Sequence, residues 1–128
     1  MSDPLRILQV FGKMNRGGAE TMIMNLYRNI DRSKIQFDFV VHTDEHCDYD
    51  DEIRFLGGKI YRVPRYNGKN HFAYKKVWND FFKTHTEYKI IHGHVRSTAS
   101  IYLRIAKKYN LVTIAHSHST SSGTGISS

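Results

Sequence analysis

Cysteine, proline and long apolar runs are all scarce in this chain. Its 128 residues include one cysteine, Cys47, and two prolines. A single cysteine can form neither an internal disulfide nor a cysteine zinc cluster, so we interpret Cys47 as a surface or half-buried thiol in a reducing compartment. No apolar run approaches the roughly 20 residues needed to span a bilayer, and Met1 to Arg6 lacks the pattern of a secretion signal. We therefore expect a cytoplasmic protein, with any peripheral attachment at the inner face of the membrane.

Acidic residues are also in the minority. The chain has 19 Lys and Arg residues against 12 Asp and Glu residues, for a formal net charge of +7. This balance favours an anionic partner, and charge alone does not choose among nucleic acid, anionic lipid and a phosphate-bearing small molecule. Nucleic acid is not expected, because no motif supports it. Basic, aromatic-edged stretches at 27–34 and 74–83 favour an anionic membrane surface as a partner, although a plain solvated face is the simpler explanation.

Short apolar runs alternate with helical patterns along most of the chain. Branched and aromatic runs predict strands at 5–11, 35–41, 59–63, 88–95 and 111–115. Apolar residues at three- and four-residue spacing predict a helix beginning at Gly18 and further helices at 52–56, 72–82 and 97–109. Trp78 is expected to pack beneath the third helix. The expected buried face of the first helix consists of Met22, Ile23, Leu26, Tyr27 and Ile30.

This alternation is typical of parallel strands joined by right-handed crossovers. We predict an α/β fold, a Rossmann-like doubly wound parallel sheet with strand order 3-2-1-4-5, over residues 1–116. The tail at 117–128 is rich in Ser, Thr and Gly and is interpreted as a linker or truncation point. In such sheets, ligands bind at the carboxyl ends of the strands, where the order reverses between strands one and four.

A glycine-containing loop joins the first predicted strand to the first predicted helix. Gly17 and Gly18 fall at the helix amino terminus, where backbone amides favour an anion, and Lys13 and Arg16 add positive charge. Adjacent glycines also let a ligand approach the main chain. The alternative is a tight turn without a ligand. Neither Gly-x-Gly-x-x-Gly nor Gly-Lys-Ser/Thr is present, which argues against a nicotinamide site and an ordinary ATPase.

The strand, the loop and the run Gly17-Gly18-Ala19-Glu20 together resemble the amino terminus of retaining GT-B glycosyltransferases of the family 4-like, capsular and exopolysaccharide type. The resemblance extends from Leu5 to about His118. It implies the amino-terminal, acceptor-side half of a GT-B fold, with donor phosphate and acceptor against the two glycines. It also implies that a partner domain outside this chain holds most of the nucleotide-sugar donor. The isolated chain is therefore expected to be inactive.

Histidines mark the ends of the last two predicted strands. His92 and His94 lie at the end of the fourth, and His116 and His118 follow the fifth. Residues two apart in a strand share a face, so the pairs gather near the ligand edge if the two strands are neighbours. The resemblance implies that His116 faces the transferred sugar, which makes it the catalytic candidate. The substrate-binding candidates are Gly17, Gly18, Arg16, His94 and His118.

Alternatives stay open for the histidines and for the whole chain. Clustered imidazoles can bind zinc, but no carboxylate or cysteine accompanies them at short spacing, so neither a metal nor a cofactor is expected. Strand-end histidines without a ligand role are the second alternative. The expected function is transfer of a sugar from a nucleotide-sugar donor to a polysaccharide or lipid-linked acceptor. Its alternative is a stand-alone phosphate- or nucleotide-binding flavodoxin-like module without transfer activity.

Overall fold

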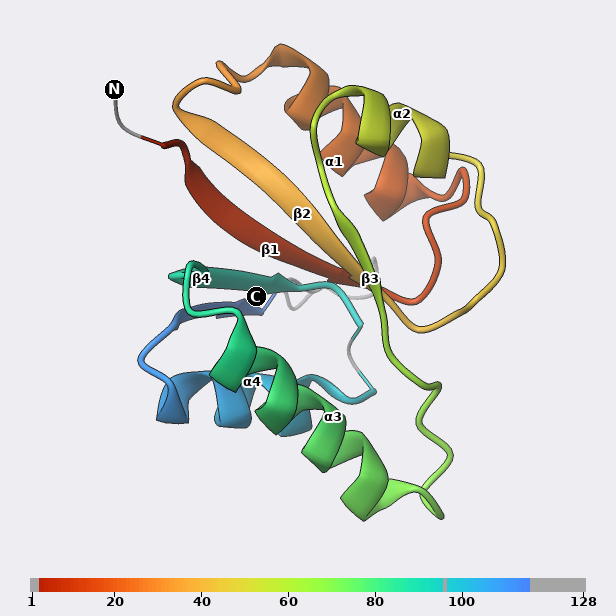
Figure 1. Cartoon of the computed structure of the whole chain (residues 1–128). Coiled ribbons are helices and arrows are strands. Elements are labelled where there is room, and N and C mark those ends of the chain that lie inside the picture. Colours follow the sequence, from red (N-terminus) through yellow and green to blue (C-terminus); the bar gives the residue numbers. More distant parts are fainter. Residues whose placement is uncertain (1–2, 96, 116–128) are drawn as a thin grey trace, which may run out of the picture.

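A parallel five-stranded sheet forms the centre of the computed structural model, which describes residues 3–95 and 97–115 (Figure 1). The strand order is β3-β2-β1-β4-β5, and neighbouring strands pair in parallel. The strands are β1 (Leu5–Phe11), β2 (Ile35–Val41), β3 (Ile60–Arg62), β4 (Ile90–Gly93) and β5 (Val112–Ala115). The predicted α/β fold with strand order 3-2-1-4-5 is therefore confirmed.

Helices cover both faces of this sheet. Over the described residues they are α1 (Gly18–Asn29), α2 (Asp50–Phe55), α3 (His71–Thr84) and α4 (Ala99–Lys108). The pair α1 and α2 lies on one face, and the pair α3 and α4 lies on the other (Figure 1). Right-handed crossovers explain this arrangement. The chain first builds outward from β1 to β3 and then returns to the other side of β1, so its later helices fall on the opposite face.

Alternating side chains along β1 divide the core in two. Leu8 and Val10 belong to the cluster on the α3–α4 side, together with Trp78. Phe11 belongs to the cluster on the α1–α2 side, together with Met24. Successive residues of a strand point to opposite faces, so both faces of the central strand are apolar. Trp78 is fully buried, as predicted.

The predicted inner face of α1 is partly wrong. Ile23 and Tyr27 are buried, but Met22 and Leu26 are 43% and 49% exposed, and Met24 is buried instead. Because a helix has 3.6 residues per turn, Ile23, Met24 and Tyr27 form one continuous stripe. Met22 and Leu26 lie beside that stripe. Their spacing is helical, but they are turned away from the sheet.

Several element ends also differ from the prediction. The helix α2 begins at Asp50, two residues before the predicted start, and β4 covers 90–93 rather than 88–95. Cys47 is 2% exposed, so its interpretation as a surface or half-buried thiol is wrong. The loop that carries it folds back onto the α1–α2 side of the core, where Cys47 packs. The predicted domain limit at residue 116 and the tail at 117–128 lie outside the described residues.

Candidate functional site

The carboxyl ends of the parallel strands lie at one edge of the sheet, where the loops after β1, β2 and β4 leave it (Figure 1). The switch point is the gap between β1 and β4. At this point β1 continues into α1 on one face, while β4 continues into α4 on the other face. Loops that part to opposite faces leave a crevice between them, and doubly wound sheets bind ligands there.

The Gly17-Gly18 turn lies at this edge. Gly17 is the N-cap of α1, and the helix begins at Gly18. The amide of Gly17 donates to Asn15 O at 2.8 Å, and the carbonyl of Gly17 accepts the first helical bond from Thr21 N at 3.0 Å. The amides in the first turn of a helix lack an acceptor within the helix, so the positive end of α1 faces the edge.

The two glycines differ in their surroundings. A Cβ on Gly17 would lie 2.6 Å from Glu20 Oε1, because the Glu20 side chain folds back over the turn. A Cβ on Gly18 would meet no atom of the described residues within 4 Å. The Glu20 carboxylate thus lies beside the positive end of α1, as the helix dipole favours. A ligand can therefore approach the backbone at Gly18. The exposed Arg16 lies two positions earlier in the chain.

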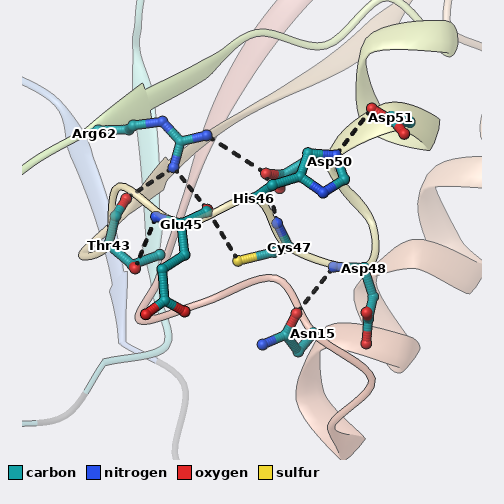
Figure 2. Close-up of polar contacts among 9 residues, drawn as sticks. All are labelled: Asn15, Thr43, Glu45, His46, Cys47, Asp48, Asp50, Asp51 and Arg62. Carbon is teal, nitrogen blue, oxygen red and sulfur yellow. Dashed lines mark hydrogen bonds and ion pairs between the residues drawn. The ribbon is translucent and has the colours of Figure 1, made fainter.

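A second loop, residues 42–49, forms the neighbouring wall of the edge (Figure 2). The amide of Asp48 donates to Asn15 Oδ1 at 2.9 Å, and the amide of Tyr49 donates to Met14 O at 3.0 Å. These bonds attach the second loop to the glycine loop. The two loops that follow β1 and β2 therefore form one continuous wall of the edge.

Arg62, the last residue of β3, holds the second loop from its other side (Figure 2). Its guanidinium donates to Thr43 O at 2.8 Å and to Glu45 O at 3.1 Å, and it pairs with Asp50 Oδ2 at 3.5 Å. The Asp50 side chain is fully buried and accepts a bond from Cys47 N at 2.9 Å. The guanidinium of Arg62 is therefore occupied by bonds to the loop and to Asp50, and it is not a free cation for a substrate.

A hollow of about 480 Å³ opens between the second loop and the end of β3, a volume typical of small-molecule sites. Its walls bear charges of both signs, and Arg65 on its rim is exposed. Such walls suit a ligand with many hydroxyl groups better than an apolar one. The lining residues are His42, Thr43, Asp44, Glu45, Arg62, Val63, Pro64 and Arg65.

His42, directly after β2, anchors a buried chain of polar side chains. Its Nδ1 lies 3.0 Å from Phe11 O, and its Nε2 lies 2.7 Å from Tyr74 Oη. The Tyr74 hydroxyl is in turn hydrogen-bonded to Thr98 Oγ1 at 3.0 Å. Burial lowers the pKa of His42 and raises the pKa of Tyr74, so both side chains are neutral. The neutral imidazole donates Nδ1–H to the carbonyl of Phe11. This chain ties the ends of β1 and β2 to the starts of α3 and α4.

His94 lies at the switch point, where its amide donates to Val10 O at 2.9 Å. Its side chain is largely enclosed, since the residue is 8% exposed and its ring stacks on Phe11 at 4.1 Å and 6°. Nε2 lies 2.9 Å from Gln9 Oε1, and the ring of His92 is 4.1 Å away. The structure thus brings His92 and His94 together, and ligand binding by His94 stays a prediction. His116 and His118 lie outside the described residues.

Comparison with known proteins gives sequence matches to a family and to a named protein. Residues 16–126 match Glycosyltransferase Family 4. The chain belongs to glycosyltransferase family 4. It is also 38% identical over 125 residues to EpsF of Bacillus subtilis (strain 168), which is named as a glycosyltransferase. That alignment covers 97% of this chain and 33% of EpsF, so the chain spans about a third of the relative's length. No solved structure gives a significant match. The predicted resemblance of the chain to the family 4-like glycosyltransferases is confirmed.

The candidate site of this family 4 chain is made of backbone and polar side chains. In residues 3–95 and 97–115, no group of three or more His, Cys, Asp or Glu side chains is arranged to hold a metal ion. Over the same residues, no helix combines the length and the apolar character needed to cross a membrane.

Three polar residues of the candidate site, namely His42, Asp50 and Arg62, were not singled out from the sequence. His42 carried a usable signal, because it follows the second strand as His94 follows the fourth. Asp50 and Arg62 carried none. They lie 12 positions apart and meet only because β3 pairs with β2 beside the exit of the second loop.

Proposed function

We propose that this family 4 chain is the acceptor-side half of a retaining GT-B glycosyltransferase. The enzyme would move a sugar from a nucleotide-sugar donor to a polysaccharide or lipid-linked acceptor. The observation that carries the proposal is the open backbone at Gly18, at the start of α1 on the switch-point edge of a family 4 sheet. Helix amino termini of this kind bind phosphate groups, because backbone amides and the helix dipole both favour an anion. The name of EpsF supports the same class of activity.

The donor phosphate occupies the turn. Gly17 and Gly18 place backbone against the phosphate and the acceptor, and Arg16 contributes a charge-assisted hydrogen bond. His116 is the proposed catalytic group. Together with the backbone amides it stabilises the charge that develops on the leaving phosphate, as donors aimed at a transition-state charge do. The proposal assigns no protein nucleophile.

The acceptor lies beside the donor, along the same edge. His94 and His118 are the proposed partners for sugar hydroxyls, with His94 held in place by its stacking on Phe11. The mixed-charge hollow of about 480 Å³ beside Arg65 offers space for further sugar units of the acceptor. Its buried wall at His42 is fixed by hydrogen bonds, so the hollow is preformed.

Most donor contacts belong to protein outside this chain. The chain spans about a third of the length of EpsF, which leaves room in such a relative for a second, donor-binding half. A membrane surface at the inner face of the membrane is a further proposed partner, because lipid-linked acceptors are held there.

The second candidate function is a stand-alone phosphate- or nucleotide-binding module without transfer activity. The same edge geometry favours it, since flavodoxin-like sheets bind nucleotides at this switch point as well. The two functions differ in what the 128 residues do alone. A module binds its nucleotide without help, whereas an acceptor-side half does not.

A transfer assay tests the proposal. A longer protein that includes this chain and the 128-residue chain itself are each incubated with uridine and guanosine diphosphate sugars and a lipid-linked sugar acceptor. We expect transfer by the longer protein only, with the anomeric configuration of the donor kept in the product. Transfer with inverted configuration would overturn the retaining mechanism. Absence of any transfer, combined with tight nucleotide binding by the short chain, would favour the module.

A further inference from the structure

Charge is divided unequally along this chain. Residues 63–128 contain ten Lys or Arg residues and two Asp or Glu residues, whereas residues 1–62 contain nine and ten. The formal charge is therefore +8 for the second part and −1 for the first, so the whole excess of +7 comes from the second part. The division matters because α3 and α4 belong to the second part and α1 and α2 to the first.

Because of the fold, the two parts of the chain that differ in charge supply the helices on opposite faces of the sheet. The helices α3 and α4 lie together on one side of the sheet, opposite α1 and α2 (Figure 1). Within α3 the one carboxylate, Asp80, is already paired with Lys76 at 2.8 Å. The helix α4 contains no acidic residue. The outer surface of these two helices, called here the α3–α4 face, is therefore strongly cationic.

A hollow of about 160 Å³ lies on the α3–α4 face, between the two helices. It is lined by Lys75 from α3 and by Arg104 and Lys108 from α4. Lys107 lines the adjoining hollow. In the part of the chain that the structure describes, none of these four cations pairs with a carboxylate. Their charges are available to an outside partner.

An aromatic side chain stands on the same face. Phe72, in the first turn of α3, is 83% exposed. Residues three, four and eleven positions apart share one side of a helix, which places Phe72 with Lys75, Lys76 and Lys83, opposite the buried Tyr74. A large apolar ring among lysines is unfavourable in water, but it is typical of helices that lie on a lipid surface.

We propose that the α3–α4 face docks on an anionic lipid bilayer, with the basic side chains at the headgroups and Phe72 inserted beside them. A bilayer fits better than a small phosphate ligand, because the cations extend over two helices and surround no buried polar group. Both helices begin at the carboxyl edge of the sheet, directly after the loops that follow β3 and β4. If the proposed function holds, docking through this face brings the acceptor edge close to a lipid-linked acceptor.

Vesicle sedimentation of the 128-residue chain tests this proposal without any need for activity. We expect the chain to sediment with vesicles of phosphatidylcholine and phosphatidylglycerol, and not with phosphatidylcholine alone. Binding should fall steeply between about 0.1 M and 1 M salt, as the Debye length shortens from about 10 Å to about 3 Å. Each basic residue near an anionic surface is worth roughly a five-fold gain in partition. The variant Arg104→Glu/Lys108→Glu should therefore bind at least about ten-fold more weakly.

The matched control makes the same change in net charge at two positions outside the α3–α4 face. Lys34 and Arg54 are exposed cations outside the α3–α4 face, and neither forms an ion pair within the described residues. Lys34→Glu/Arg54→Glu should keep most of the binding. Phe72→Ala should weaken the binding that remains at high salt, with an unchanged melting temperature.

Three results would overturn the proposal. The first is an equal loss of binding in both double variants, which would show that net charge alone is responsible. The second is displacement of the chain from vesicles by inorganic phosphate at matched ionic strength, which would indicate a phosphate site. The third is equally tight binding to a DNA duplex, which would indicate a general polyanion surface.

Discussion

Neighbouring glycines at the start of α1 have different tolerances for a side chain. Gly18→Ala adds a methyl group where no described atom lies within 4 Å. We expect an unchanged or slightly raised melting temperature, since Ala is better than Gly in a helix by up to about 1 kcal/mol. In a longer, active protein, turnover should fall by at least about ten-fold, or about 1.4 kcal/mol, because the methyl occupies the approach of the donor phosphate.

Gly12→Ala is the matched control for that prediction. Gly12 also has open space around its Cβ position, but it follows β1 instead of starting the helix. Turnover and melting temperature are measured for both variants. Unchanged turnover in Gly18→Ala would remove Gly18 from the proposed donor site.

Buried and neutral, His42 makes stability depend on pH. Its pKa in the folded protein lies below the ordinary value of 6.5, because burial disfavours the charged imidazole. At acidic pH the unfolded chain therefore binds a proton more readily than the folded chain does. The stabilising contribution is fully present above about pH 6.5 and is lost as pH falls toward the folded-state pKa. We expect the free energy of unfolding of the wild type to fall more steeply below pH 6.5 than that of His42→Gln.

Urea unfolding at a series of pH values measures this difference. The other histidines are common to both proteins, so the difference between the two curves isolates His42. Tyr74→Phe serves as a second variant. It removes the hydroxyl that bonds His42 and Thr98 but keeps the titrating imidazole. Parallel curves for the wild type and His42→Gln would contradict the assignment of His42 as a buried neutral base.

At the scale of elements, one carboxylate in the middle of β2 is bonded to residues at or just before the amino ends of three other strands. Asp38 in β2 pairs with Arg6 of β1 at 2.8 Å, accepts from Lys59 N just before β3 at 2.8 Å, and accepts from the hydroxyl of Tyr88 just before β4. Its side chain is fully buried. Asp38→Ala leaves these donors without their acceptor. We expect the free energy of unfolding, measured with urea, to fall by about 3 kcal/mol.

Asp80→Ala provides the comparison for that loss. Asp80 pairs with Lys76 at 2.8 Å on α3, but both side chains are largely exposed. An exposed pair gains little because water and salt screen it, so we expect no measurable change in unfolding. Equal destabilisation by the two substitutions would show that burial is not what gives Asp38 its effect.

At the scale of the whole molecule, the candidate site is formed by loops at one edge of the sheet. Its walls come from the loops after β1, β2 and β4 and from the end of β3. Under the proposed function, most donor contacts come from protein outside this chain, so we expect nucleotide sugars to bind the 128-residue chain only weakly. Titration calorimetry with uridine and guanosine sugars measures this. A micromolar dissociation constant, worth about 8 kcal/mol, would mean that the site is complete and would favour the stand-alone module.

The sequence by itself determined the layout of the fold and the position of the glycine turn. Alternating strand and helix patterns with right-handed crossovers leave few topologies, and the observed order 3-2-1-4-5 is one of them. The same order places the Gly17-Gly18 turn and the end of β4 at one edge, because parallel strands all end there. These features follow from short-range patterns, and short-range patterns are visible in a sequence.

Only the tertiary structure decided which polar side chains meet and which apolar ones are covered. His42 and Tyr74 are 32 positions apart, and their bond exists because the end of β2 lies under the start of α3. Met22 keeps helical spacing but is exposed, whereas Cys47 lies in a polar loop and is buried. Burial depends on which elements pack together, and helical or strand periodicity fixes only which residues share a face.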